Sequence, residues 1–235
     1  MKLFGKLTKE TSFFKEQPRD MQVLLMTNMI YAFVLPVIEI FVGAYIMRSS
    51  NDPKIVALYQ LTVYTGIPFT FMINGYLLRW FRISNLYSFG MLLSGVSMFV
   101  MMGLETLSFE GVAVAGFLMG ASFGFFWANR DYLALGTTND QNRNYYYGLE
   151  TFFYTITAIL VPLAVGWFLG AANRNGWFGG QMVQSYRMVT VAVVVLTILS
   201  SIVIHRDRFK NPAQKKFLFF KFDQLWNKLM ALAGL

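Results

Sequence analysis

Residues 111–134 read GVAVAGFLMGASFGFFWANRDYLA, a stretch with almost no charge until its last turns. A hydrocarbon core of ~30 Å is crossed by about 20 helical residues of this character. Gly116, Gly120 and Gly124 recur at four-residue intervals, which places small residues on one helix face. Helices in lipid associate closely through such faces. The segment therefore predicts a membrane-spanning helix packed tightly against a neighbour.

Five other stretches have the same apolar character. The composition agrees, because hydrophobic residues make up 56%, charged residues 14% and the mean hydropathy is +0.47, whereas soluble domains carry ~25% charge. Barrel strands need only ~10 residues, so these longer stretches favour helices. We expect an all-α membrane protein with six transmembrane helices and no inserted soluble domain. The five other predicted spans are 22–47, 55–78, 83–103, 146–171 and 186–204.

The basic residues alternate between the two sides of this arrangement. Sixteen of the 20 Lys and Arg residues fall in the arm 1–21, in the loop after the second span, around the end of the fourth span, where Arg130 and Arg143 lie, and in the tail 205–235. Loops with such an excess stay in the cytoplasm. The sequence therefore predicts a span domain over 22–204 in the plasma (inner) membrane, with both termini cytoplasmic.

The excess of basic residues does not indicate nucleic-acid binding, because these residues lie between spans instead of on one soluble face. Cysteine is absent, which excludes disulfides and thiolate metal sites. We expect no metal and no cofactor. In the tail, lysines alternate with leucines at helical spacing, which predicts a basic amphipathic helix that either lies on the lipid bilayer or packs on loops of its own protein.

A family resemblance begins at residues 74–82, NGYLLRWFR. The segment is similar to the loop motif G-x-x-x-D-R-x-G-R-[RK] of the major facilitator superfamily. Arg79 and Arg82 fall on its two arginines, while Leu78 stands in place of the acid and Phe81 in place of the second glycine.

A second segment resembles the same family. Asp140, Arg143 and Gly148 match the acid-x-x-R-x-x-x-x-G pattern that follows its fourth span. The resemblance covers nearly the whole chain and implies the N-terminal six-helix half of a secondary transporter for a small organic solute. A second six-helix half, or a second copy, would then complete a path that opens alternately to each side. The resemblance also implies that the tail 205–235 is the linker that joins the two halves.

The fifth predicted span contains Pro162, followed by Gly166 and Gly170. The proline predicts a bend, and the glycines predict another close helix contact. Val161 precedes the proline where the family's antiporter motif has glycine, so antiport is not indicated.

Charged residues at membrane depth point to function, because each costs ~2.5–3.5 kcal/mol on insertion scales. Glu39 lies well inside the first span, and helical spacing places Asn28 and Tyr31 on about the same face. We expect these side chains to line a substrate or proton pathway. Desolvation favours the neutral form of a carboxylate, so Glu39 could couple transport to protons. The alternative is a structural hydrogen bond to another helix.

Arg130 lies near the cytoplasmic end of the fourth span and is the other pathway candidate. It would either extend to the headgroups or offer a fixed cation to an anionic substrate or a carboxylate. Asp131 suggests packing or an ion pair, and Glu150 a charge at the start of a helix. The aromatic cluster Tyr145–Tyr147 is typical of the membrane interface.

The sequence does not favour an enzymatic function. Residues 120–124 spell G-x-S-x-G, but this pattern needs a strand, a sharp turn and a helix, whereas here it lies within an apolar helix. The single histidine, His205, falls beyond the last span. The rival to a transporter is a non-catalytic six-helix membrane subunit or interaction protein of a larger complex.

Overall fold

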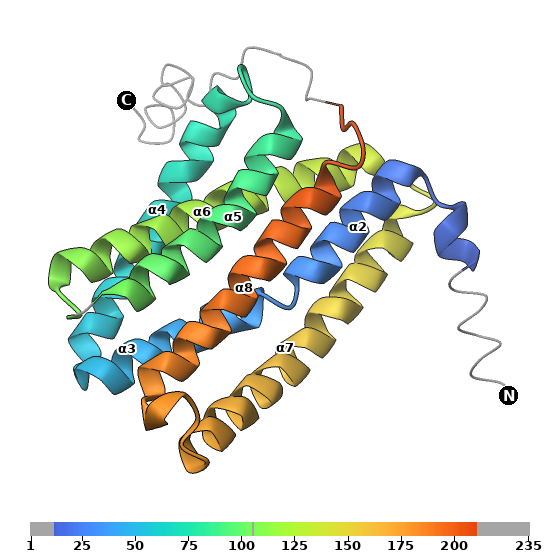
Figure 1. Ribbon diagram of the computed structural model, residues 1–235. Helices are drawn as coiled ribbons and strands as arrows, with labels where there is room; N and C mark the ends of the chain where they lie inside the picture. The colour runs from blue at the N-terminus through green and yellow to red at the C-terminus, as the bar shows by residue number, and fades with distance from the viewer. Residues whose placement is uncertain (1–11, 105, 211–235) are drawn as a thin grey trace, which may run out of the picture.

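The computed structural model describes residues 12–104 and 106–210, and every regular element in that part of the chain is helical (Figure 1). Five of the helices, α4 to α8, are long and apolar enough to cross a membrane. The elements are α2 (Arg19–Tyr31), the π-helical turn η1 (Val37–Phe41), α3 (Val42–Ser50), α4 (Pro53–Leu77), α5 (Ile83–Gly103), α6 (Phe109–Thr137), α7 (Arg143–Arg174), the 3₁₀ turn η2 (Trp177–Gly180) and α8 (Met182–Ile204).

Local capping explains where two of the long helices begin. The Asp52 carboxylate accepts a hydrogen bond of 2.9 Å from the Lys54 amide, and Pro53 follows at the first helical position of α4. The Ser108 hydroxyl accepts from the Gly111 amide at 3.2 Å and caps α6. These contacts satisfy amide groups that have no partner within the helix. Both starts lie within two residues of the predicted spans.

Helix α6 packs between α4 and α5, and its small residues make this possible. A Cβ added to Gly66 of α4 would lie 2.7 Å from the Phe117 carbonyl oxygen, and one added to Gly120 would clash with the carbonyl of Val63. On the other side, the Ser122 hydroxyl donates to the Gly90 carbonyl of α5 at 2.7 Å. Backbone contact and interhelical hydrogen bonds of this kind join helices in lipid.

The glycines of the fifth predicted span behave differently. A Cβ added to Gly166 of α7 would meet no atom within 4 Å. The close contact expected there is therefore missing from the part of the chain that the structure describes. Helix α7 continues through Pro162 without an interruption of its helical assignment.

The predicted span 22–47 is a discontinuous segment instead of one helix. Helix α2 ends at Tyr31, a turn follows, and Pro36 precedes η1 and α3. Proline lacks the amide hydrogen that would continue the helical ladder. The three pieces still run lengthwise along the bundle (Figure 1).

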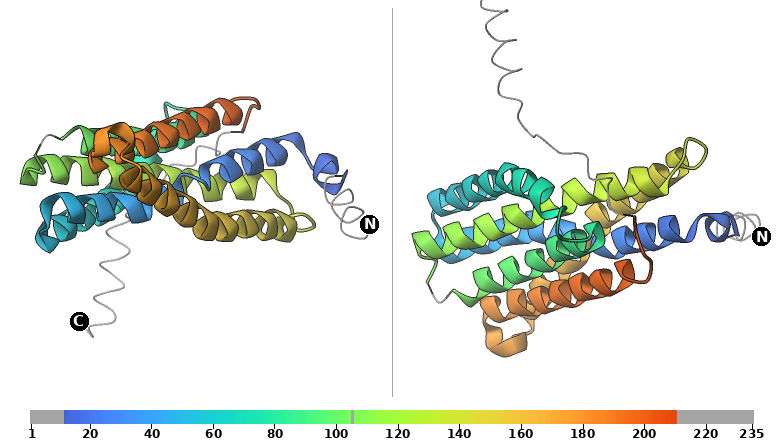
Figure 2. Two further views of the ribbon diagram at one scale, coloured as in Figure 1. Left: turned by 60° about the horizontal axis from the view of Figure 1, so that its bottom comes forward. Right: turned by 90° about the horizontal axis from the view of Figure 1, so that it is seen from above.

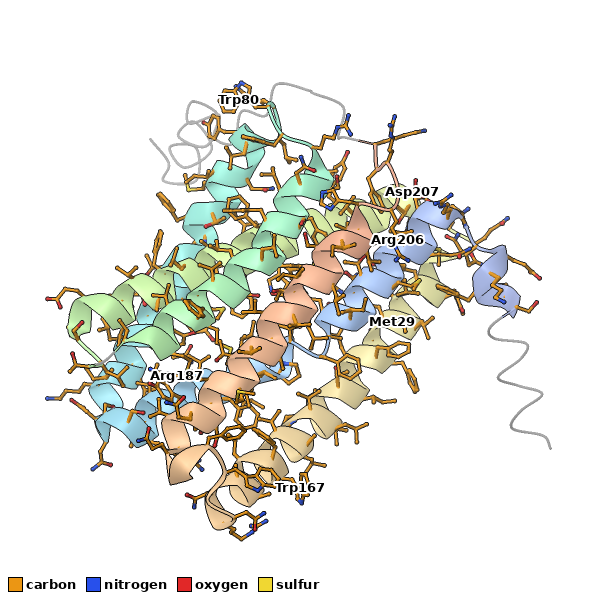
Figure 3. All side chains as sticks on the ribbon, viewed as in Figure 1. Met29, Trp80, Trp167, Arg187, Arg206 and Asp207 are labelled. Carbon is orange, nitrogen blue, oxygen red and sulfur yellow. The ribbon has the colours of Figure 1, made fainter. Side chains whose placement is uncertain are left out.

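The loops divide between two ends of the bundle. At one end Arg19 pairs with Asp207 at 3.8 Å, and His205 contacts the Asn85 side chain at 3.2 Å. Figure 3 shows Trp80 and Arg206 toward this end, with Arg187 and Trp167 toward the other. The start of α2, the α4–α5 loop and the end of α8 therefore lie at one end of the bundle, and the α7–α8 loop lies toward the other. The predicted tail 205–235 lies outside the described residues from residue 211 onward, as does the predicted arm before residue 12.

Two helices leave much of their surface uncovered. Within the apolar 18-residue stretch of each helix, 61% is buried inside the protein in α5, but only 22% in α4 and 11% in α7. Helix α7 runs along the outside of the bundle (Figure 2, left). The uncovered side chains include Tyr64 of α4 and Leu163 and Trp167 of α7, each about two-thirds exposed.

Candidate functional site

A buried ion pair joins α6 to α7. The Arg130 guanidinium donates to both carboxylate oxygens of Glu150, from Nε at 3.0 Å and from Nη2 at 2.5 Å. Their side chains are 14% and 1% exposed. Bidentate pairing of this kind is strong and fixes both side chains. Of the partners predicted for Arg130, the structure shows a carboxylate, that of Glu150.

Glu150 lies two turns inside α7, which begins at Arg143. The interpretation of Glu150 as a helix-start charge is therefore wrong. Sequence spacing could not reveal its partner, because the two residues come from different helices. Asp131 also approaches Arg130, at 3.4 Å, but its side chain is 62% exposed.

Asn28 extends the ion pair to α2. Its amide nitrogen donates to the Glu150 carboxylate at 2.5 Å and to the Tyr146 hydroxyl at 2.8 Å, while the Tyr87 hydroxyl donates to its oxygen. The Tyr146 hydroxyl contacts Glu150 at 3.2 Å. The network therefore gives hydrogen-bond partners to Asn28, Tyr87, Tyr146 and Glu150, which α2, α5 and α7 bury together, whereas the neighbouring Tyr154 hydroxyl of α7 is buried without a partner among the described residues. Tyr146 is fully buried, so its assignment to the membrane interface was wrong.

Aromatic rings surround the Arg130 guanidinium. It lies 4.7 Å from the Trp127 ring centroid and 5.5 Å from that of Tyr154. Such cation–π contacts strengthen when water is excluded. Trp127 is important for a second reason, because it also lines the cleft described below.

Tyr31 connects α2 to α5 and α6. Its hydroxyl donates to the Ser94 hydroxyl at 3.0 Å, and its ring packs 4.5 Å from that of Phe126. A second polar contact, which sequence reasoning missed, joins Asn74 of α4 to Asn129 of α6 through reciprocal amide hydrogen bonds of 2.8 and 3.2 Å. In the sequence, the only indication of this contact is that Asn74 and Asn129 are uncharged polar residues within apolar spans.

Glu39 stands apart from Asn28 and Tyr31. It is exposed, whereas those two residues are buried. The expectation of one shared face assumed an unbroken helix, and the turn after Tyr31 together with the extra residue of a π turn rotates Glu39 away. Within the described chain the Glu39 carboxylate makes no hydrogen bond or ion pair.

Glu39 lines a cleft of about 370 Å³ between η1, α4 and α6. The volume falls within the usual range for small-molecule sites, ~300–1,000 Å³. The walls are predominantly aromatic and aliphatic, with Gln60 as a further polar group. The lining residues are Ile38, Glu39, Tyr59, Gln60, Val63, Tyr64, Ile67, Phe123 and Trp127.

The residues of the loop motifs lie away from this cleft. Arg143 pairs with Asp140 at 3.1 Å on an exposed turn, and Gly148 has open space around it. The Arg79 guanidinium lies 5.3 Å from the Tyr76 ring centroid, and Arg82 immediately precedes α5. Across the described ranges no cluster of three His, Asp or Glu residues could hold a metal ion.

Comparisons with known proteins identify relatives but no family. No protein-family profile matches the chain. It is 25% identical over 173 residues to an uncharacterized protein encoded in the sodM 3' region of Geobacillus stearothermophilus, an alignment covering 74% of this chain and 79% of that protein. It is 22% identical over 173 residues to the uncharacterized protein YqgE of Bacillus subtilis (strain 168), covering 73% of this chain. The match spans only 40% of YqgE, so that relative carries a long region outside it.

Proposed function

We propose that the chain is a six-span half of a secondary transporter, which moves a small organic solute by alternating access. The observation that carries this proposal is Glu39, whose carboxylate lies on a π turn, faces an open cleft and has no ion-pair partner within residues 12–104 and 106–210. Carboxylates at membrane depth are rare and mark transport or proton pathways. π turns also occur frequently at functional sites.

The discontinuous segment supports this proposal. Transporter sites near the bilayer midplane are typically formed where spanning helices are interrupted. In this proposal α2, η1 and α3 together make the first of six spans, since residues 19–50 are long enough to cross. The motif resemblance at Arg79, Arg82, Asp140, Arg143 and Gly148 and the alternation of loops favour a major facilitator arrangement with both termini cytoplasmic.

The uncovered faces of α4 and α7 support a second six-helix half or a second copy as a partner. The Glu39 cleft opens beside α4, so one bundle supplies only one wall of a path. The length of YqgE beyond the match is consistent with a relative that carries further spans. Movement of one half against the other would expose the cleft to each side in turn.

Uptake into proteoliposomes tests this function. A panel of labelled organic solutes is screened with wild-type protein, Glu39→Gln and Glu110→Gln, where Glu110 is an exposed glutamate in the first turn of α6. We expect at least one solute to be taken up by wild type and by Glu110→Gln but at a strongly reduced rate by Glu39→Gln. Equal uptake by all three proteins would contradict the role of Glu39.

A six-helix subunit of a larger complex is the second candidate. The broad apolar exposure of α7 favours it, because a partner protein could cover that face. Such a subunit would not need an open cleft with an unpaired carboxylate. Solute uptake distinguishes the two candidates.

A further inference from the structure

We propose that the Glu39 cleft binds a monovalent organic cation with an apolar or aromatic body. This inference rests on the proposed transport function and specifies its substrate class. Glu39 is isolated from other charged side chains of the described structure. Its carboxylate lies inside the apolar part of the chain without a partner in the described structure, so a cationic ligand would supply the missing counter-charge.

The walls of the cleft are mainly aromatic and aliphatic. Tyr59, Tyr64, Phe123 and Trp127 contribute four aromatic rings to the lining. Aromatic faces attract organic cations through their quadrupoles, and quaternary ammonium groups are recognised in this way. The aliphatic part of the lining would accept an apolar body. An anionic ligand would instead meet Glu39 with no lining cation to offset it.

The charges in and near the cleft are predominantly negative. Among the residues that the structure describes, no Lys or Arg lines the cleft. Arg130 lies behind Trp127, but its charge is engaged by Glu150 through two hydrogen bonds and approached by Asp131 at 3.4 Å. These neighbours contribute one positive and two negative charges, and Glu39 adds a third negative charge. The local field therefore favours a cation.

Equilibrium binding to the purified 235-residue chain tests this inference directly. The probes are tetraphenylphosphonium and benzyltrimethylammonium, and tetraphenylborate is the anion that matches the shape of the first. We expect saturable binding of at least one cation, which Glu39→Gln weakens by about tenfold or more, a loss typical of hydrogen bonds or pairing to a charged group. Tetraphenylborate should compete at least about tenfold more weakly than the matching cation, by the same charge argument.

Two variants complete the design. Tyr64→Leu, at a side chain 69% exposed, should weaken cation binding by about threefold or more, as expected for a lost cation–π contact. Glu110→Gln should bind like wild type. Size-exclusion profiles and thermal midpoints of all variants establish that the proteins are folded.

Three results would overturn the inference: no saturable binding of either cation, equal affinity of folded Glu39→Gln and wild type, or equal competition by tetraphenylborate. Failure of the transport proposal looks different. Glu39-dependent cation binding without uptake into proteoliposomes would leave the binding site intact and reject transport. Uptake of another solute without cation binding would reject the substrate class alone.

Discussion

Arg130 and Glu150 are buried as a pair, so removing one partner leaves the other without a counter-charge. We predict that Glu150→Leu destabilises the protein by ~3–5 kcal/mol, the usual cost of breaking a buried pair. The thermal midpoint in detergent should fall accordingly. The double variant Arg130→Met, Glu150→Leu should recover much of the loss, because it removes both charges.

The exposed pair Asp140–Arg143 provides the control for this experiment. Asp140→Asn should change stability by less than ~1 kcal/mol, because exposed ion pairs contribute little. A Glu150→Leu protein as stable as Asp140→Asn would show that the buried network does not hold α6 and α7 together.

Glu39 should behave in the opposite way in a stability measurement. Its carboxylate has no hydrogen bond or ion pair within the described chain that the substitution would break, so we predict that Glu39→Gln does not destabilise the protein. The thermal midpoint should not fall below that of wild type, while solute uptake is lost. A large fall in the midpoint would indicate that Glu39 has a structural role instead.

Single residues also show what the sequence could not reveal. Glu39 could be found because a carboxylate in an apolar stretch is conspicuous by itself. The partners of Arg130 and Asn28 could not, since hydrogen bonding between helices depends on their relative rotation and depth. Tyr146 illustrates the ambiguity: a tyrosine suits both a membrane interface and a buried network, because it has an apolar ring and a polar tip.

Among the elements, the α4–α6 contact depends on backbone approach at glycines. We predict that Gly120→Ala destabilises the bundle by ~1–3 kcal/mol, as overpacking does elsewhere, because its new methyl group meets the Val63 carbonyl. Gly166→Ala is the matched control, with open space at that position, and should be neutral or slightly stabilising through helix propensity. Comparable losses in both variants would contradict the packing account.

The long helices were predictable from hydropathy and length, whereas the capping contacts of Asp52 and Ser108 at two of their starts were found only in the structure. The interruption of the first span was not. Pro36 was visible in the sequence, but the turn begins several residues earlier, after Tyr31, and a π turn has no sequence signature of its own. Tertiary contacts of α2 and η1 with their neighbours decide that local structure.

At the scale of the whole molecule, the proposed topology predicts which loops are accessible from each side. Cysteine is absent, so single cysteines can be introduced without background. In intact cells an impermeant thiol reagent should label Asn175→Cys, in the loop before η2, but should label Gln141→Cys only after permeabilisation. Both positions are exposed. The reverse pattern would invert the proposed orientation.

We propose that the Glu39 cleft opens alternately to both sides of the membrane. Accessibility of position 64 tests this most directly, because Tyr64 lines the cleft near the middle of α4. A Tyr64→Cys protein in oriented vesicles is exposed to impermeant thiol reagent from the outside or the inside alone. Val195→Cys, at an exposed apolar position of α8, is the control for a lipid-facing site. The account predicts labelling of Tyr64→Cys from either side and of Val195→Cys from neither. Labelling of Tyr64→Cys from one side only, or from neither, would contradict alternating access through this cleft.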